Sequence, residues 1–372
     1  MTKVAAVTAL GPSLDELWER VLSGESAIRQ ITRFPVVNYR SSAAAHIEDL
    51  EQSKNRSMIH SLIERLISQM GPVPSDSLLI TATTKAGIDN LERLRRGGAA
   101  DPGDILLSSV TGAVKKRCDL RDSGVNISAA CASSAIAVAR GSALIRSGRA
   151  DAVFVCGLDL VTEFVFSGFS CLGALSSAPC MPFDRDRSGL SLGEGAGALL
   201  LMSRERAMDE GRPCLGTVLG WGVTNDAYHI TAPARDGSGL IAAIRKSLSM
   251  AMLREADISA ICAHGTGTVY NDLMELTAFH SLFDKRKVPV FSIKGAIGHS
   301  MGAAGIIEVV LGLKALSEKT VPPTVGLLNP TEGAEGLVSP DPVELKGDCL
   351  LTPNSGFGGV NAAIILKRGE VS

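Results

Sequence analysis

The 372-residue sequence predicts a layered α/β fold built from two similar halves. Strand-like and helix-like runs alternate along the whole chain, which is typical of sheets covered by helices. The composition is 45% hydrophobic and 20% charged, so the chain can bury a sizeable core. Two pairs of similar segments recur at nearly equal spacing, which indicates a duplication. If the two sheets stack on shared helices, the result is a five-layer α/β/α/β/α sandwich.

The first half is expected to begin with a strand and a helix and to continue with four more strands around a helix of small residues. These elements are a strand at 4–10, a helix at 13–23 that starts at a Ser cap, strands at 78–83, 124–128 and 151–157, a helix at 132–147, a strand at 198–202 and a charged helix at 203–211.

The second half repeats this order. We expect a helix at 239–253, strands at 258–263 and 289–293, a helix at 303–317 and a strand at 362–367. The run at 195–202 resembles the run at 359–366, 164 residues later, and the helices that start at 132 and 303 are 171 residues apart. We therefore divide the chain into an N-terminal half, 1–205, and a C-terminal half, 206–372.

Bulk properties exclude several classes of function. The net charge of −2 does not indicate a nucleic acid or an anionic membrane as partner. The N-terminus lacks a signal peptide pattern, and no run of about 18 apolar residues predicts a membrane span. The eight cysteines form no Cys-x-x-Cys pair, which argues against a zinc site or disulfide framework and favours the cytoplasm. Apart from Cys131, we interpret them as small buried apolar residues.

Cys131 is the candidate nucleophile. The segment 124–140 places it between a strand and a helix, among small residues that leave room for a thioester. A thiol at a helix N-terminus is at the positive end of the helix dipole, which favours the thiolate. Taken alone, this segment favours a buried structural cysteine.

Two of the six histidines lie in the most glycine-rich loops of the second half. His264 follows the strand at 258–263 and precedes a Gly-Thr-Gly-Thr run, and His299 lies in the loop before the helix at 303–317. Each could be a structural histidine. Together with Cys131 they indicate nucleophilic catalysis in which imidazole N–H groups stabilise an oxyanion.

Five motifs resemble those of the β-ketoacyl-acyl-carrier-protein synthases of the thiolase superfamily, in the Cys-His-His branch. They occur in the order of that family, and the resemblance is continuous from about residue 120 onward. The motifs are Ala130-Cys-Ala-Ser-Ser, Pro182-Phe-Asp-Arg-Asp-Arg-Ser-Gly with Gly193-Glu-Gly-Ala-Gly, His264-Gly-Thr-Gly-Thr with Asn271-Asp-Leu-Met-Glu, Lys294-Gly-Ala-Ile-Gly-His-Ser-Met-Gly-Ala-Ala-Gly, and Asn354-Ser-Gly-Phe-Gly-Gly-Val-Asn.

The resemblance implies a thiolase-like fold and a ping-pong reaction of fatty acid or polyketide biosynthesis. Cys131 would take an acyl group from an acyl carrier protein. Decarboxylation of malonyl-carrier protein would then give an enolate that attacks the acyl thioester. No metal or resident cofactor is expected, because the phosphopantetheine arrives on the carrier.

The same resemblance assigns further roles. The backbone N–H groups of Cys131 and Phe357 would form the oxyanion hole, and Phe357 would also be the gate of the acyl pocket. Lys294 and Glu308 would support the second histidine, and the apolar neighbours of Glu308 favour a buried carboxylate with a partner. Thr266 and Thr268 would bind the pantetheine arm.

The first third departs from the family pattern. The segment before residue 78 lacks much of the usual helical cap over the acyl channel, so we expect a shortened cap. The last motif is one residue short, and Val360 replaces a usual Thr. These departures leave the acyl chain length and the pathway open.

The same motifs disfavour several rival functions. A degradative thiolase would need a second cysteine in the last loop, which here reads Gly-Phe-Gly-Gly, and Cys349 lies too early. The Cys-His-Asn ketoacyl synthases are disfavoured by His299, and a cysteine hydrolase leaves the Lys294 and Phe357 motifs unexplained. The remaining alternative is a chain-length-factor-like or partner subunit of a heterodimeric polyketide or aryl-polyene synthase.

The expected partners are an acyl carrier protein and a second subunit, in a homodimer or in a heterodimer with a related ketosynthase-like chain. An acidic carrier needs a basic surface, although solvated helix faces explain the same residues. The candidates are Arg93, Arg95 and Arg96, then Lys115, Lys116 and Arg117, then Arg204 and Arg206.

Overall fold

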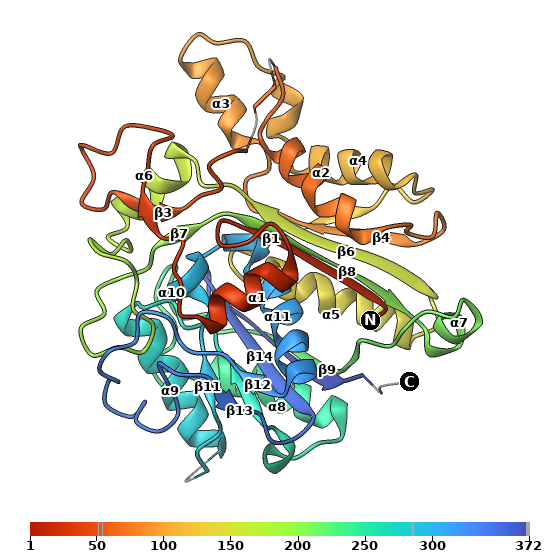
Figure 1. The fold of residues 1–372 in the computed structure, drawn as a ribbon, viewed down its shortest axis with the longest axis vertical. Helices are drawn as coiled ribbons and strands as arrows, with labels where there is room; N and C mark the ends of the chain where they lie inside the picture. Colours follow the sequence, from red (N-terminus) through yellow and green to blue (C-terminus); the bar gives the residue numbers. More distant parts are fainter. Residues whose placement is uncertain (51, 54, 284–285, 370–372) are drawn as a thin grey trace.

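The computed structural model describes residues 1–50, 52–53, 55–283 and 286–369 and has the five layers that the sequence predicts. Two five-stranded sheets are separated by a central pair of helices, and further helices cover both outer faces (Figure 1). The N-terminal strand lies in the upper sheet of the figure.

The first sheet has the strand order β1-β8-β6-β4-β5. The β1-β8 and β8-β6 pairs are antiparallel, and the β6-β4 and β4-β5 pairs are parallel. Its central strands are buried along their whole length, so both faces must be covered. The strands are β1 (Lys3–Thr8), β4 (Leu78–Ala82), β5 (Val125–Ile127), β6 (Ala152–Asp159) and β8 (Gly195–Met202).

The second sheet repeats this arrangement. Its order is β9-β15-β14-β10-β11, again with two antiparallel pairs followed by two parallel pairs. The similar runs at 195–202 and 359–366 therefore occupy equivalent strands, as expected for a duplication. The strands are β9 (Gly216–Asn225), β10 (Ala260–Cys262), β11 (Val290–Phe291), β14 (Cys349–Gly356) and β15 (Val360–Arg368).

The central layer consists of α5 (Ser133–Arg146) and α11 (Ala304–Glu318), each in contact with both sheets. Their close approach depends on glycine, because a Cβ at Gly305 would lie 2.7 Å from the backbone nitrogen of Ala135. Almost all of α11 is buried, which matches a helix that is apolar on all sides.

Helices on the outer faces complete the sandwich. The first sheet is covered by α2 (Ile59–Met70) and α4 (Leu107–Cys118), and the second by α8 (Ser238–Ala251) and α9 (Val269–Phe283). The remaining elements are α1 (Leu14–Leu22), α3 (Ile88–Arg95), α6 (Glu163–Cys171), α7 (Arg204–Asp209), α10 (Lys294–Ile297), η1 (Pro102–Ile105), η2 (Glu255–Asp257), η3 (Met301–Ala303), and the short strands β2 (Arg29–Gln30), β3 (Ala43–Ala45), β7 (Leu192–Gly193), β12 (Thr320–Val321) and β13 (Val343–Glu344).

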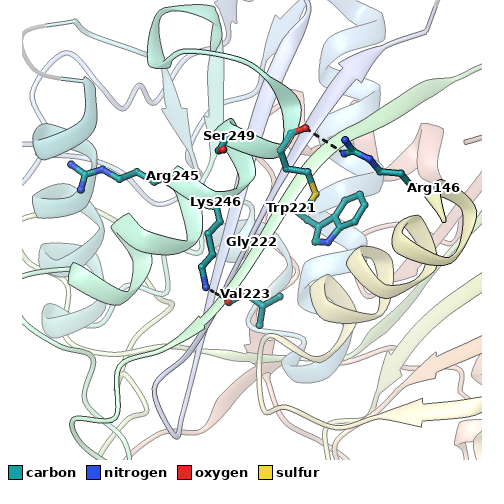
Figure 2. A pocket seen from close by; sticks show the side chains of 8 residues that line it. Arg146, Trp221, Gly222, Val223, Arg245, Lys246 and Ser249 are labelled. Atoms are coloured by element: carbon teal, nitrogen blue, oxygen red, sulfur yellow. Dashed lines mark hydrogen bonds between the residues drawn. The ribbon is translucent and has the colours of Figure 1, made fainter.

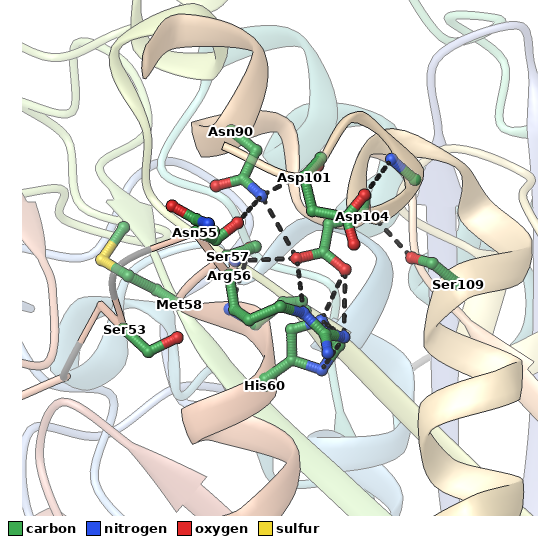
Figure 3. A network of polar contacts seen from close by, with 12 residues as sticks. Ser53, Asn55, Arg56, Ser57, Met58, His60, Asn90, Asp101, Asp104 and Ser109 are labelled. Atoms are coloured by element: carbon green, nitrogen blue, oxygen red, sulfur yellow. Dashed lines mark hydrogen bonds and ion pairs between the residues drawn. The ribbon is translucent and has the colours of Figure 1, made fainter. Parts of the chain in front are cut away.

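A small cap of loops with α3 and α6 projects from one end of the sandwich (Figure 1). Two buried carboxylates fix it. Glu194 accepts hydrogen bonds from the Arg33 guanidinium and from the N–H groups of Ile47 and Val161. Asp104 accepts from the Ser57 N–H and from the side chains of Arg56 and Asn90 (Figure 3).

Several expected elements agree with the structure, and others were missed. Ser13 caps α1 as expected, by accepting from the Glu16 N–H at 3.3 Å. The outer helices α2, α4 and α9, the cap helices α3 and α6, and the strands β9 and β14 were not expected. The boundary between residues 205 and 206 stays a prediction, although β8 ends at Met202 and β9 begins at Gly216. Among the described residues, no helix is both long enough and apolar enough to cross a membrane.

Candidate active site

Cys131 lies in a tight turn between β5 and α5. Ala130, just before it, has a positive φ of 48°, and Ser133 fixes the turn by donating to the Ala130 carbonyl at 2.6 Å and accepting from the Ala129 N–H at 2.8 Å. The thiol is buried, with 7% of the residue exposed. The residues around the cysteine are small, and Gly356 of β14 approaches them closely, since a Cβ there would lie 3.3 Å from the Ala130 Cβ.

Burial dominates the acidity of this thiol. It raises the pKa of Cys131 to about 11, although Lys294 and the Phe357 N–H act in the opposite direction. Burial therefore opposes the thiolate that the helix N-terminus is expected to favour. The interpretation of the other cysteines as buried is wrong for Cys171 and Cys214, whose side chains are exposed.

His264 follows β10, and the next helix holds its loop in place. Glu275 accepts from the backbone N–H groups of His264 and Gly265 at 2.7 and 2.6 Å, and Asp272 accepts from the Thr266 N–H at 3.1 Å. Both carboxylates lie on α9. Asp272 also accepts from the Phe183 N–H at 2.8 Å, which links the Pro182 motif to this loop.

The side chains of Asp272 and Glu275 are buried close together. Burial and the neighbouring Asp272 raise the pKa of Glu275 to about 8. Asn271 donates to both carboxylates, at 3.2 and 2.8 Å. The motif is visible in the sequence, but no role was expected for these residues. The available signal was the three-residue spacing of the acids directly after a Gly/Thr loop, which places them on one helix face.

His299 is fixed between the two halves of the chain. Its backbone N–H donates to the Ser191 carbonyl at 2.7 Å, and its carbonyl accepts from the Gly193 N–H at 3.0 Å. The loop that carries it turns through Gly298 at a φ of 67° and continues into η3 and α11. His299 thus comes from the second half but is held by a strand segment of the first.

The structure brings Cys131, His264 and His299 together. The Nε2 atom of His299 lies 2.9 Å from the Cys131 Sγ atom, and the two imidazole rings are perpendicular with centroids 5.2 Å apart. Their donor atoms all lie within 4.8 Å of one another, and in the described part of the chain no other set of three such ligands is found. Burial and the nearby Lys294 cation hold the pKa of both histidines well below the usual value, so the rings are neutral.

Lys294 and Glu308 form a buried ion pair beside His264. The Lys294 ammonium also contacts the His264 carbonyl and lies 3.3 Å from the His264 Nδ1 atom. An ammonium group only donates, so Nδ1 must accept and the ring proton must be on Nε2. Asn354 donates to the other oxygen of Glu308. Lys294 thus supports His264, whereas the sequence analysis expected it around His299.

A cavity of about 410 Å³ leads to the three residues. Thr266 and Thr268 line it, and their hydroxyl groups are 2.9 Å apart. Phe357 stands beside Cys131 and packs on Phe169 of α6 with ring centroids 5.7 Å apart. The cavity therefore combines the residues expected for pantetheine binding and for the gate.

The basic clusters considered for carrier docking are partly engaged in ion pairs. Arg96 pairs with Glu163, Arg117 with Glu64 at 2.7 Å, and Arg206 with Asp76 at 2.9 Å. These pairs reduce the positive charge that the clusters offer to a partner.

Two family descriptions match the chain. The β-ketoacyl synthase N-terminal domain matches residues 79–207, and the β-ketoacyl synthase C-terminal domain matches residues 215–328. Together they cover more than half of the sequence, and both histidine loops and the cysteine turn lie inside them.

Similar proteins extend over the whole chain. The 3-oxoacyl-[acyl-carrier-protein] synthase 2 of Rhizobium meliloti is 30% identical, with 99% of this chain and 98% of the relative covered. The enzyme of the same name from Coxiella burnetii is 28% identical, with the same coverage. Among solved structures, the ishigamide ketosynthase/chain length factor superposes with a TM-score of 0.91 at 27% identity, covering 99% of this chain and 98% of that one.

Proposed function

The chain belongs to the β-ketoacyl synthase family, and from this premise we propose that it is a 3-oxoacyl-[acyl-carrier-protein] synthase of fatty acid or polyketide biosynthesis. The observation that carries the proposal is the contact of Cys131 Sγ with His299 Nε2 at 2.9 Å, with His264 facing both at the end of a cavity. A nucleophile, two neutral imidazoles and an access route are the parts that a decarboxylating condensation needs.

In the first step the Cys131 sulfur attacks the thioester carbonyl of an acyl-carrier protein. The new C–S bond forms as the pantetheine sulfur leaves, and the proton of Cys131 passes to that sulfur. The carbonyl oxygen becomes an oxyanion, and the N–H groups of Cys131 and Phe357 stabilise it. The high pKa of Cys131 favours passing the proton during attack rather than keeping a thiolate in the resting enzyme.

In the second step malonyl-carrier protein enters and loses CO2. Breaking the carbon–carbon bond leaves its electron pair on an enolate, whose oxygen would accept hydrogen bonds from the ring N–H groups of His264 and His299. The enolate carbon then attacks the acyl group on Cys131, and the sulfur leaves and recovers a proton. Neutral histidines are required here, because only they stabilise the enolate without protonating it.

Three further residue sets complete the proposal. Lys294 and Glu308 keep the proton of His264 on Nε2, where it faces the substrate. Thr266 and Thr268 would hold the pantetheine arm, and Phe357 with Phe169 would gate the acyl pocket. The phosphopantetheine arrives on the carrier protein, and no resident cofactor or metal has a place in this scheme.

We also propose that the chain works as a dimer in the cytoplasm with an acyl carrier protein as substrate. The resemblance to a ketosynthase/chain length factor favours a heterodimer as a second candidate, in which this chain is the active member because it keeps Cys131 and both histidines. The unpaired, scattered cysteines support the reducing compartment.

Intact-mass analysis after incubation with a panel of acyl-carrier proteins tests the function. We expect an acyl adduct on the wild-type chain and none on Cys131→Ala, with the adduct mass giving the preferred chain length. Addition of malonyl-carrier protein should remove the adduct and release a β-ketoacyl product. A chain that stays unmodified with every donor, alone and with related subunits, contradicts the proposal.

A further inference from the structure

An open groove of about 850 Å³ lies at the edge of the second sheet, away from the catalytic residues. The edge strand β9 contributes Trp221 and Val223, helix α8 contributes Arg245, Lys246 and Ser249, and the last residue of α5, Arg146, closes the other side (Figure 2). Glycines bring α8 onto β9, since a Cβ at Gly222 would lie 2.0 Å from the Ala243 carbonyl oxygen. The groove is therefore bounded by three elements that are fixed against one another.

The groove is positively charged and contains no acidic side chain. Among the described residues, no carboxylate pairs with Arg146, Arg245 or Lys246. Three of the cations named above as candidates for carrier docking, Arg96, Arg117 and Arg206, are instead paired with carboxylates of the chain. Unpaired cations along a groove attract an anionic partner and speed its association.

Two of the cations donate hydrogen bonds to backbone carbonyl groups and not to carboxylates. Arg146 lies over the Trp221 ring, 5.9 Å from its centroid, and donates to the Met250 carbonyl at 3.3 Å. Lys246 donates to the Val223 carbonyl at 3.3 Å (Figure 2). Each keeps further N–H groups for a ligand. Trp and Arg are also the residues that contribute most to protein interfaces.

The groove is distant from the substrate cavity. Helix α5 begins two residues after Cys131 and ends at Arg146, and its 14 residues give a length of about 21 Å. The groove and the nucleophile are thus at opposite ends of one helix. A partner that binds here does not deliver its substrate to Cys131 from the same position.

We propose that this groove docks an acidic segment of a protein partner, which goes beyond the proposed catalytic function. The groove combines cations with the apolar side chains of Trp221 and Val223, which suits an acidic protein segment, and it is too open to give a small anion many contacts. In a two-fold symmetric contact, a second copy of this chain would present the same cations and be repelled. The unpaired edge of β9 also suits an extended segment, which adds its backbone to a sheet edge.

Binding of a synthetic peptide tests the proposal. The probe is a fluorescein-labelled acetyl-(Glu-Val)4-amide, followed by anisotropy, with a (Lys-Val)4 peptide as its matched control. We expect saturable binding of the acidic peptide, with a Kd that rises roughly severalfold between 50 and 200 mM salt because salt screens the charges. Binding should also quench the fluorescence of Trp221. The quench should be absent in Trp221→Phe.

Variants separate the groove from the rest of the surface. Combined Arg146→Ala, Arg245→Ala and Lys246→Ala should raise the Kd at least about tenfold, while Lys346→Ala, an exposed cation just after β13, should leave it unchanged. Formation of the β-ketoacyl product should be the same in all of them. Equal peptide binding by the triple variant would overturn the proposal. So would binding of phosphatidylglycerol vesicles without binding of the peptide. A triple variant that differs from the wild type only in the mass of its oligomer would overturn it as well.

Discussion

The two halves of the molecule begin their central helices with the same turn, but only one turn carries a thiol. Ala130 has a φ of 48° just before Cys131 and α5. Met301, which lies 171 residues later in the chain, has a φ of 53° just before Gly302 and α11. The spacing equals that of the two helices noted in the sequence, so Gly302 occupies the place that Cys131 has in the first half.

The strand that faces each turn decides what the turn can do. Asp159, at the end of β6, accepts the Gly302 N–H at 2.8 Å and closes this position. The equivalent end of β14 is Gly356, and a Cβ there would lie 3.0 Å from the Cys131 nitrogen. One half therefore uses the turn to fix its loop, and the other leaves space at the Cys131 N–H for a thioester oxygen.

Filling that space should have the largest effect. Gly356→Ala places a methyl group in front of the Cys131 N–H, and loss of one oxyanion donor lowers a rate by about 10²–10³-fold. We expect such a fall in acyl transfer to Cys131, measured by rapid-quench mass spectrometry. Gly168→Ala on α6 is the matched control, because no atom lies within 4 Å of its added Cβ. Equal rates for both variants would show that the N–H is not used.

The acidity of the Cys131 thiol gives a second test of the turn in the first half. Because burial raises the pKa of Cys131 to about 11, the reactive thiolate should increase roughly tenfold for each pH unit up to that value. Iodoacetamide labelling of Cys131, followed by peptide mass spectrometry, should therefore rise about a hundredfold from pH 7.5 to 9.5. The Cys131→Ala variant gives the background from other cysteines. A rate that levels off near pH 8 would mean that the thiol is far more acidic.

The turn before α11 can be tested by removing Asp159, which accepts the Gly302 N–H. Asp159 also accepts from the hydroxyl groups of Thr83 and Thr84, at 2.7 and 2.8 Å. Asp159→Ala leaves these buried donors unpaired and should lower the free energy of unfolding by about 1–3 kcal/mol, measured by urea denaturation. Asp159→Asn keeps one acceptor and should lose less. Unchanged midpoints for both would remove Asp159 from this role.

The smallest effect concerns Glu275, which holds the His264 loop. Its pKa is raised from 4.5 to about 8 in the folded chain. Between these two values the folded chain holds a proton on Glu275 that the unfolded chain has released, so stability falls as the pH rises. Stability from this group is lost as the pH rises toward 8. Between pH 6.5 and 8 we expect a decrease of about 1–2 kcal/mol, seen as a falling midpoint in thermal unfolding. Glu275→Gln should flatten the slope, and a midpoint that rises with pH would contradict the assignment.

The sequence was sufficient for the layers, the duplication and the placement of the three site residues. Apolar strands and helices of small residues have clear periodicity, and the Cys131, His264 and His299 loops have distinctive glycine patterns. Helix α9 was missed because its buried residues surround it on most sides, so no single apolar face marks it.

Other features depend on contacts that no local pattern records. Strand β9 contains Gly216, Gly220 and Gly222, residues that weaken a strand pattern but let α8 pack against it. The pairing of Arg96 with Glu163 joins residues 67 positions apart. The raised pKa of Cys131 results from burial of the thiol, which depends on packing and not on the local sequence pattern.

The contribution of both halves to one site links catalysis to assembly. Cys131 and the segment that holds the His299 backbone come from the first half, while both imidazole rings come from the second. Neither half contains a working set of groups, so acyl transfer begins only when the two have docked. Two fragments divided between α7 and β9 would each be inactive, and recovered turnover on mixing them would report their association directly.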